Sequence, residues 1–100
     1  MWENVEINLG IIHTDIYHVI SFKFIGECTP QEVEIHTSCG CSSGKWNDTT
    51  RTLEVSYRSG KIPPQVVGNQ HVRKSIKIIY LCNGIRCEED LFFKAELVNE

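Results

Sequence analysis

Apolar and polar residues alternate with a period of two through most of the chain, which is the pattern of half-buried β-strands. Each row is short and is followed by residues that favour turns. No segment of ten or more residues keeps a helical apolar period. The pattern therefore predicts an all-β domain of six or seven short strands. The apolar rows are Val5, Ile7 and Leu9; Ile20, Phe22 and Phe24; Val33 and Ile35, continuing through Thr37 toward Cys39; Leu53, Val55 and Tyr57; Ile76, Ile78 and Tyr80; and Leu91, Phe93, Ala95 and Leu97.

The connections between the rows carry their own signals. Gly10 and Gly26 are expected to end the first two strands, and the polar stretch 41–50 is expected to form a loop. The two prolines at 63–64 remove two backbone donors, so this segment is expected to cross between sheets. Asn-Gly at 83–84 supplies the positive φ angles of a tight hairpin turn, so the last two strands should be antiparallel neighbours.

Length and charge narrow the class of protein. A chain of 100 residues with 41% hydrophobic content fits one domain, spanning residues 1–100. The net charge is −3, and the ten Lys and Arg residues are scattered, which argues against a nucleic-acid surface. The longest apolar-rich stretch, 76–82, is too short to span a bilayer, and no signal peptide is visible at the N-terminus. We therefore expect neither membrane insertion nor nucleic-acid binding.

Two segments carry a resemblance to a known family. They are Phe22-Lys23-Phe24-Ile25-Gly26 and the strand from Val33 that runs into Thr37-Ser38-Cys39-Gly40-Cys41. With Val55-Ser56-Tyr57, Gly60-Lys61 and Ser75-Ile76-Lys77-Ile78, they resemble a bacterial family of immunoglobulin-like domains that has been catalogued as a domain of unknown function. The likeness begins near residue 17, and its specific part is the T-S-C-G-C pentapeptide. The family is related to domains of bacterial envelope proteins and, more distantly, of ciliary and centrosomal scaffolds.

This resemblance implies an immunoglobulin-like antiparallel β-sandwich of about seven strands. Such domains bind or space other proteins, and the family has no catalytic residue or cofactor that could be carried over to this chain. Many relatives follow a secretion signal, whereas this sequence begins directly. A leaderless sandwich of this size suits a bacteriophage virion protein, by fold analogy, and the expected location is a virion or the bacterial cytoplasm.

Cys39 and Cys41 are the candidate metal ligands, because two thiols flanking one glycine could bind zinc together with a second pair. That second pair would be Cys82 with Cys87, or His36 with His71. The loop after the third strand should lie at the opposite end of a sandwich from the last hairpin, which disfavours a four-cysteine site. The simpler interpretation is that Cys39 packs as a small buried side chain.

The remaining cysteines permit a disulfide. Cys82 and Cys87 enclose four hairpin residues and could be bridged, and Cys28 could compete as a partner because it should lie at the same end of the sandwich. Without a secretion signal, however, we expect reduced thiols.

The sequence contains no catalytic constellation, so we expect a non-enzymatic structural or protein-interaction module, for example a capsid-decorating or tail-associated virion protein. Its contact surface should be loops or an exposed sheet edge. Trp46 and Trp2 are the candidate contact residues, although each could instead cover the end of the core. The alternatives are a small thiol or zinc protein centred on Cys39 and Cys41, and an envelope scaffold domain whose leader has been removed. The expected partners are other proteins, including a capsid protein, a tail protein or a second copy of the chain.

Overall fold

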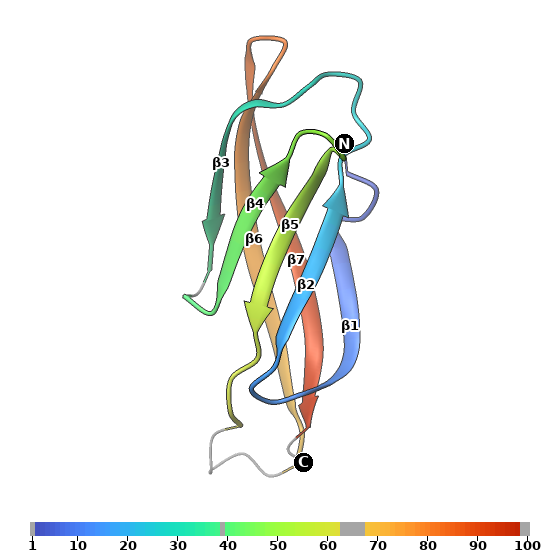
Figure 1. The fold of residues 1–100 in the computed structure, drawn as a ribbon, viewed down its shortest axis with the longest axis vertical. Helices are drawn as coiled ribbons and strands as arrows, with labels where there is room; N and C mark the ends of the chain where they lie inside the picture. Colours follow the sequence, from blue (N-terminus) through green and yellow to red (C-terminus); the bar gives the residue numbers. More distant parts are fainter. Residues whose placement is uncertain (1, 39, 63–67, 99–100) are drawn as a thin grey trace.

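The computed structural model describes residues 2–38, 40–62 and 68–98, which form two β-sheets packed face to face (Figure 1). The predicted all-β sandwich is confirmed. A hairpin turn joins β6 to β7, and β5 and β6 belong to different sheets, both as predicted. The two prolines at 63–64 lie outside the described residues. The strands are β1 (Glu6–His13), β2 (Tyr17–Lys23), β3 (Gln31–Thr37), β4 (Ser42–Asn47), β5 (Thr52–Arg58), β6 (Gln70–Cys82) and β7 (Ile85–Val98).

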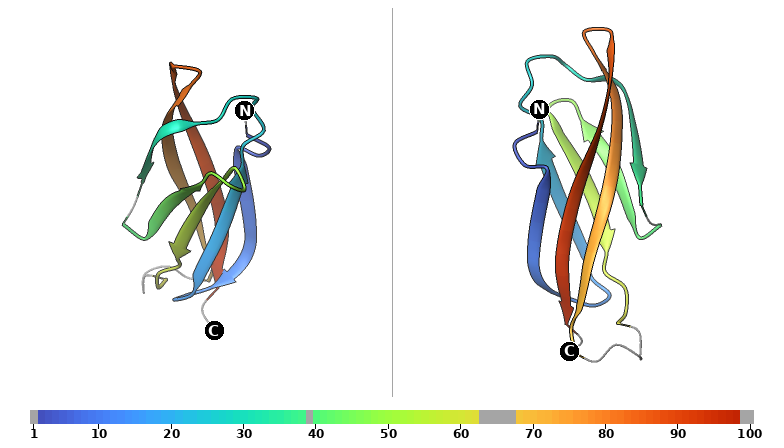
Figure 2. Two further views of the ribbon diagram at one scale, coloured as in Figure 1. Left: turned by 45° about the horizontal axis from the view of Figure 1, so that its top comes forward. Right: turned by 180° about the vertical axis from the view of Figure 1, so that it is seen from behind.

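The strand order is β1-β7-β6-β3 in the larger sheet and β2-β5-β4 in the smaller one. Apart from β1, this is the connectivity of an immunoglobulin-type sandwich, in which the second, fifth and fourth strands face the seventh, sixth and third. The view from behind shows β1 beside β7 (Figure 2). The two strands run parallel, with Ile7 opposite Phe93, while the other strand pairs among the described residues are antiparallel, as predicted.

The core lies between the sheets and is built from the apolar rows of the sequence. Because side chains alternate across a strand, one parity of each strand is buried. The even-numbered residues of β2 and β6 and the odd-numbered residues of β5 and β7 face inward. The largest buried side chains are Tyr57, Tyr80, Phe22, Phe93, Ile20, Leu53, Ile76, Ile78, Leu91 and Val55.

Gly10 does not end the first strand. It has a φ of 74° and forms a bulge, across which the pairing with β7 shifts between Asn8 and Ile11. The Gly10 N–H donates to the Asn8 side-chain oxygen over 2.9 Å. Beyond the bulge the strand continues with the opposite parity, so Ile12 is buried while Ile11 is 68% exposed.

The polar stretch 41–50 is not all loop, because it contains β4, which pairs with β5 throughout its length. Gly44 lies against Ile35 of the other sheet, where a β-carbon would come within 2.5 Å of the Ile35 Cγ2 atom. The close approach of the two sheets therefore requires glycine at this position. Among the described residues no helix is long and apolar enough to cross a membrane.

Candidate interaction surface

Exposed apolar side chains are concentrated at one side of the sandwich, formed by β1, β2 and the segments that flank them. Of seven well-exposed large apolar residues in the described ranges, only Ile85, at the tip of the last hairpin, lies elsewhere. Tyr17 and Val19 are the most exposed, at 70% each. We call this region the β1–β2 side. Its six apolar residues are Val5, Ile11, Ile16, Tyr17, Val19 and Ile25.

The backbone of β2 is paired on one side only. The Ser59 N–H donates to the Ile16 carbonyl, and the Phe24 N–H donates to the Arg51 carbonyl, so even-numbered residues of this segment direct their peptide groups toward β5. The Lys23 carbonyl instead accepts a hydrogen bond from the Glu3 N–H on the other side. The peptide groups of Tyr17, Val19 and Ser21 therefore point away from β5, at an edge that no other described strand pairs.

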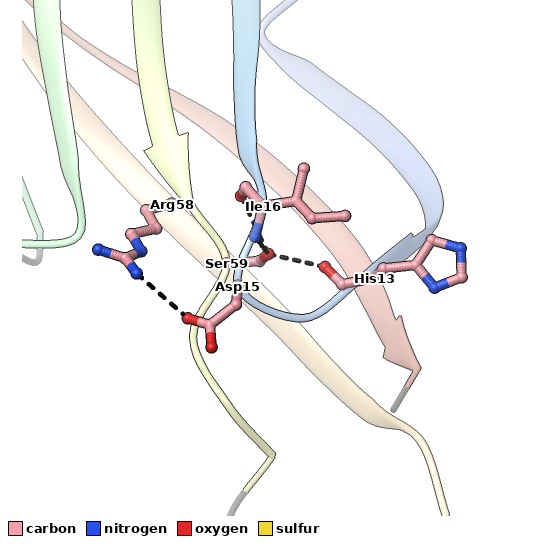
Figure 3. Close-up of polar contacts among 5 residues, drawn as sticks. All are labelled: His13, Asp15, Ile16, Arg58 and Ser59. Carbon is pink, nitrogen blue, oxygen red and sulfur yellow. Dashed lines mark hydrogen bonds and ion pairs between the residues drawn. The ribbon is translucent and has the colours of Figure 1, made fainter. Parts of the chain in front are cut away.

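Ser59 holds the turn between β1 and β2 in place (Figure 3). This side chain is fully buried, and its hydroxyl lies 2.7 Å from the His13 carbonyl oxygen and 3.1 Å from that of Ile16. The hydroxyl also accepts the Ile16 N–H over 3.0 Å, while the Ser59 carbonyl accepts the Asp15 N–H. One serine thus satisfies the peptide groups of a turn that would otherwise lack partners.

Arg58 connects this turn to the exposed face of β2. Its guanidinium forms an ion pair with Asp15 at 3.5 Å and lies 5.5 Å from the centroid of the Tyr17 ring. Both charged side chains are about half exposed, so the ion pair contributes little to stability. The contacts orient the Tyr17 ring, which remains open to solvent.

The outer surface of the larger sheet has the opposite character. Glu6 accepts a hydrogen bond from Arg73 at 3.0 Å and pairs with Lys94 at 3.4 Å, while Glu88 pairs with Lys77 and Arg86 at 3.0 Å each. The Arg73 hydrogen bond and the Lys94 ammonium lower the pKa of the Glu6 carboxyl below its ordinary value. We call this surface, formed by the outward residues of β6 and β7 together with Glu6, the charged face.

The two tryptophan predictions differ in outcome. Trp2 is only 5% exposed and packs edge-on against Phe24 and Trp46, so its prediction as an exposed contact residue is wrong. It covers the end of the core. Trp46 is half-buried in the same aromatic cluster, and its indole N–H donates to Asp48 over 2.8 Å. A contact between Trp46 and a partner stays a prediction.

The cysteine predictions are corrected by the structure. Cys82 is bonded to Cys28, with 5.6 Å between the two Cα atoms, and Cys87 is a free thiol. The candidate bridge between Cys82 and Cys87 is not formed, because the two-residue turn pairs Cys82 with Ile85 and Cys87 with Tyr80. The competing partner that the sequence offered, Cys28, is bonded to Cys82 instead. The expectation of reduced thiols is also wrong for Cys28, Cys82 and Cys41, which are disulfide-bonded.

The alternative of a zinc site at Cys39 and Cys41 has no counterpart in the described ranges, where no three His, Cys, Asp or Glu side chains gather as metal ligands. Cys39 lies outside those ranges, and the disulfide leaves Cys41 without a thiolate for a metal. Thr37, at the end of β3, pairs with Ile76, which is six residues from Cys82 and thus roughly 20 Å away along the strand. The expected separation of the two cysteine-bearing ends is confirmed.

The sequence contains a signal for the β1–β2 side that is not part of the predicted apolar rows. The core row of β2 has even numbers, yet Tyr17 and Val19 are apolar residues at odd-numbered positions. Apolar residues on both faces of an edge strand indicate a second buried surface.

Comparisons with known proteins add no relative. No family model, no curated protein and no solved structure matches this chain. The resemblance to the bacterial immunoglobulin-like family therefore stays a prediction.

Proposed function

We propose that this protein is a non-catalytic interaction module that binds another polypeptide through the β1–β2 side. The observation that supports this most directly is the location of the exposed apolar residues. Six of the seven lie between residues 5 and 25, and the two most exposed, Tyr17 and Val19, belong to a strand whose outer edge has no partner strand among the described residues. Large exposed apolar patches and open sheet edges are both typical of protein-binding surfaces.

The setting that we propose is the bacteriophage virion, as a capsid-decorating or tail-associated protein, and a bacterial envelope scaffold is the second candidate. The Cys28–Cys82 disulfide supports these two settings over the bacterial cytoplasm. Disulfides persist in oxidising surroundings such as virion surfaces and the periplasm, and are rare in reducing cytosol.

Site-specific photo-cross-linking tests the surface. A photoreactive amino acid is introduced at Val19 in one variant and at Lys77 in another, and each is expressed in the native context. Lys77 is an exposed residue of the charged face, between β3 and β7 and away from β1. We expect position 19 to give a cross-linked polypeptide and position 77 to give none. Cross-links only from position 77, or equally from both, would show that the β1–β2 side is not the contact surface.

The identity of any cross-linked polypeptide other than a second copy of the chain, read by mass spectrometry, separates the two settings. A capsid or tail protein supports the virion, and a periplasmic or outer-membrane protein supports the envelope. A cytoplasmic partner would count against both.

A further inference from the structure

The four sheet edges of the sandwich differ in how they are protected against another strand. Natural edges are blunted by bulges, charges or short length. The β1 edge carries the bulge at Gly10. The β3 edge is irregular between Gln31 and Glu34, and Glu32 there has a φ of 50°. The β4 edge carries the charge of Lys45 near the middle of the strand. These three edges are poor templates for a further strand.

The β2 edge has none of these protections. Its register against β5 is unbroken from Tyr17 to Lys23, and it contains no proline and no bulge. The first formal charge along the strand is Lys23, at its last position. A regular and uncharged edge is the arrangement that accepts a further strand.

The length of this edge is set at both ends. At one end the Lys23 carbonyl is taken by the Glu3 N–H, and Trp2 forms an antiparallel bridge with Phe24. At the other end the turn held by Ser59 begins at Ile16. The free peptide groups thus belong to Tyr17, Val19 and Ser21, so an incoming strand pairs over five residues.

We propose that the occupant of this edge is β2 of a second copy of the chain, in antiparallel orientation, so that the three-stranded sheets of two copies form one continuous sheet. This proposal rests on the proposed function and names the partner of the same side. An antiparallel twofold pairing is isologous, which is the commonest symmetry of soluble oligomers. The register that pairs the free window with itself places Val19 opposite Val19 of the partner subunit and Tyr17 opposite Ser21 of the partner subunit.

This register satisfies every free peptide group of the window. Each directly opposed pair exchanges two backbone hydrogen bonds, so the three pairs form about six. The Val19 side chains of the two copies meet at the twofold axis, and each Tyr17 ring is diagonal to the opposing Val19, within reach of an aromatic side chain. A foreign strand would gain the same backbone bonds, but the absence of charge and the central valine make the window complementary to itself.

The first test compares Val19→Pro with Val19→Thr by light scattering and native mass spectrometry. Proline removes the N–H at the centre of the edge and is tolerated there because this N–H has no partner within the fold. Threonine keeps the N–H and the branched shape. We expect native protein and Val19→Thr to have twice the single-chain mass of 11.5 kDa, and Val19→Pro to have the single-chain mass with an unchanged circular dichroism spectrum.

The second test fixes the register. In a Cys87→Ser background, Val19→Cys should form a disulfide-linked dimer on mild oxidation, because opposed residues about 5.5 Å apart are within disulfide reach. Ser21→Cys, which would face Tyr17 of the partner subunit, should cross-link at least tenfold less.

A dimer that persists in Val19→Pro would overturn the β2 edge as the interface. Single-chain mass for native protein at every concentration would overturn the second copy as the occupant. In that case a cross-link from position 19 to a different polypeptide leaves the proposed function standing, whereas no cross-link from position 19 removes both proposals.

Discussion

The charged face and the β1–β2 side both present apolar side chains outward, but these side chains are covered by neighbouring residues to different extents. On the charged face the ring of Phe92 is half-buried beneath the Arg73 guanidinium, which lies 4.0 Å from the ring centroid. On the β1–β2 side the Arg58 guanidinium lies 5.5 Å from the centroid of the Tyr17 ring, and Tyr17 stays 70% exposed. The same chain thus covers one outward aromatic residue with a cation and leaves the other open, which is expected where a partner supplies the cover.

The backbone shows the same contrast. Strands β6 and β7 of the charged face each have a neighbouring strand on both sides over part of their length, residues 76–81 of β6 and residues 92–98 of β7. Strand β2 is paired only with β5. The two regions therefore differ both in the backbone pairing of their strands and in the chemistry of their outward side chains. Substitutions in each region test this difference.

The largest expected effect comes from the disulfide that connects the two regions. Cys28 follows β2, and Cys82 ends β6 of the larger sheet. Replacing both with alanine removes a crosslink between residues 54 positions apart, for which we expect a loss of about 4 kcal/mol in the free energy of unfolding. Urea denaturation measures this loss. Cys87→Ser is the matched control and should be close to neutral, because Cys87 is free. Equal stability of the double variant and this control would contradict the prediction.

A smaller effect is expected from Ser59→Ala, which disturbs only the β1–β2 side. The buried hydroxyl serves the Ile16 N–H and the His13 carbonyl, and its removal leaves both without that partner. We expect a loss of about 1–3 kcal/mol and faster amide hydrogen exchange in the turn from His13 to Ile16. Ser56→Ala is the control, because Ser56 lies on the exposed side of β5, which ends just before Ser59. Unchanged exchange in the turn would show that Ser59 does not hold it.

Much of the fold could be predicted because burial follows sequence parity. The inward rows of β2, β5, β6 and β7 are those that the alternation indicated. Strand β4 could not be found in this way, because its inward positions include Gly44 and its remaining residues are mostly polar. It forms a strand because it pairs with β5 and because Gly44 leaves room for Ile35, which is a contact between residues of different sheets.

The sequence predicted the type of candidate site, an exposed sheet edge, but not its location. An exposed sheet edge was expected, but the choice among four edges depends on which strands end up without neighbours, and that is decided by topology. The disulfide was closer to prediction, because an Asn83-Gly84 turn of two residues by itself pairs Cys82 with Ile85 and excludes direct opposition to Cys87. The sequence does not determine that Cys28 is the partner of Cys82. That pairing depends on how the β2–β3 connection packs against β6 in the folded protein.

The smallest expected effect is on the charged face, where Glu6→Gln removes the carboxylate shared by Arg73 and Lys94. The pKa of Glu6 is lowered from its ordinary value of 4.5, so the folded state favours the ionised carboxyl. Its contribution to stability is present above pH 4.5 and is lost as the pH falls through the lowered pKa. The melting temperature of the variant should therefore lie slightly below that of the native protein at pH 7, and the two should converge well below pH 4.5. The dimer mass should not change at pH 7, because the charged face takes no part in the proposed contact. A difference in melting temperature that persists at low pH would show that Glu6 acts through packing. Loss of the dimer in this variant would show that the charged face takes part in the contact and that the two regions do not differ in this respect.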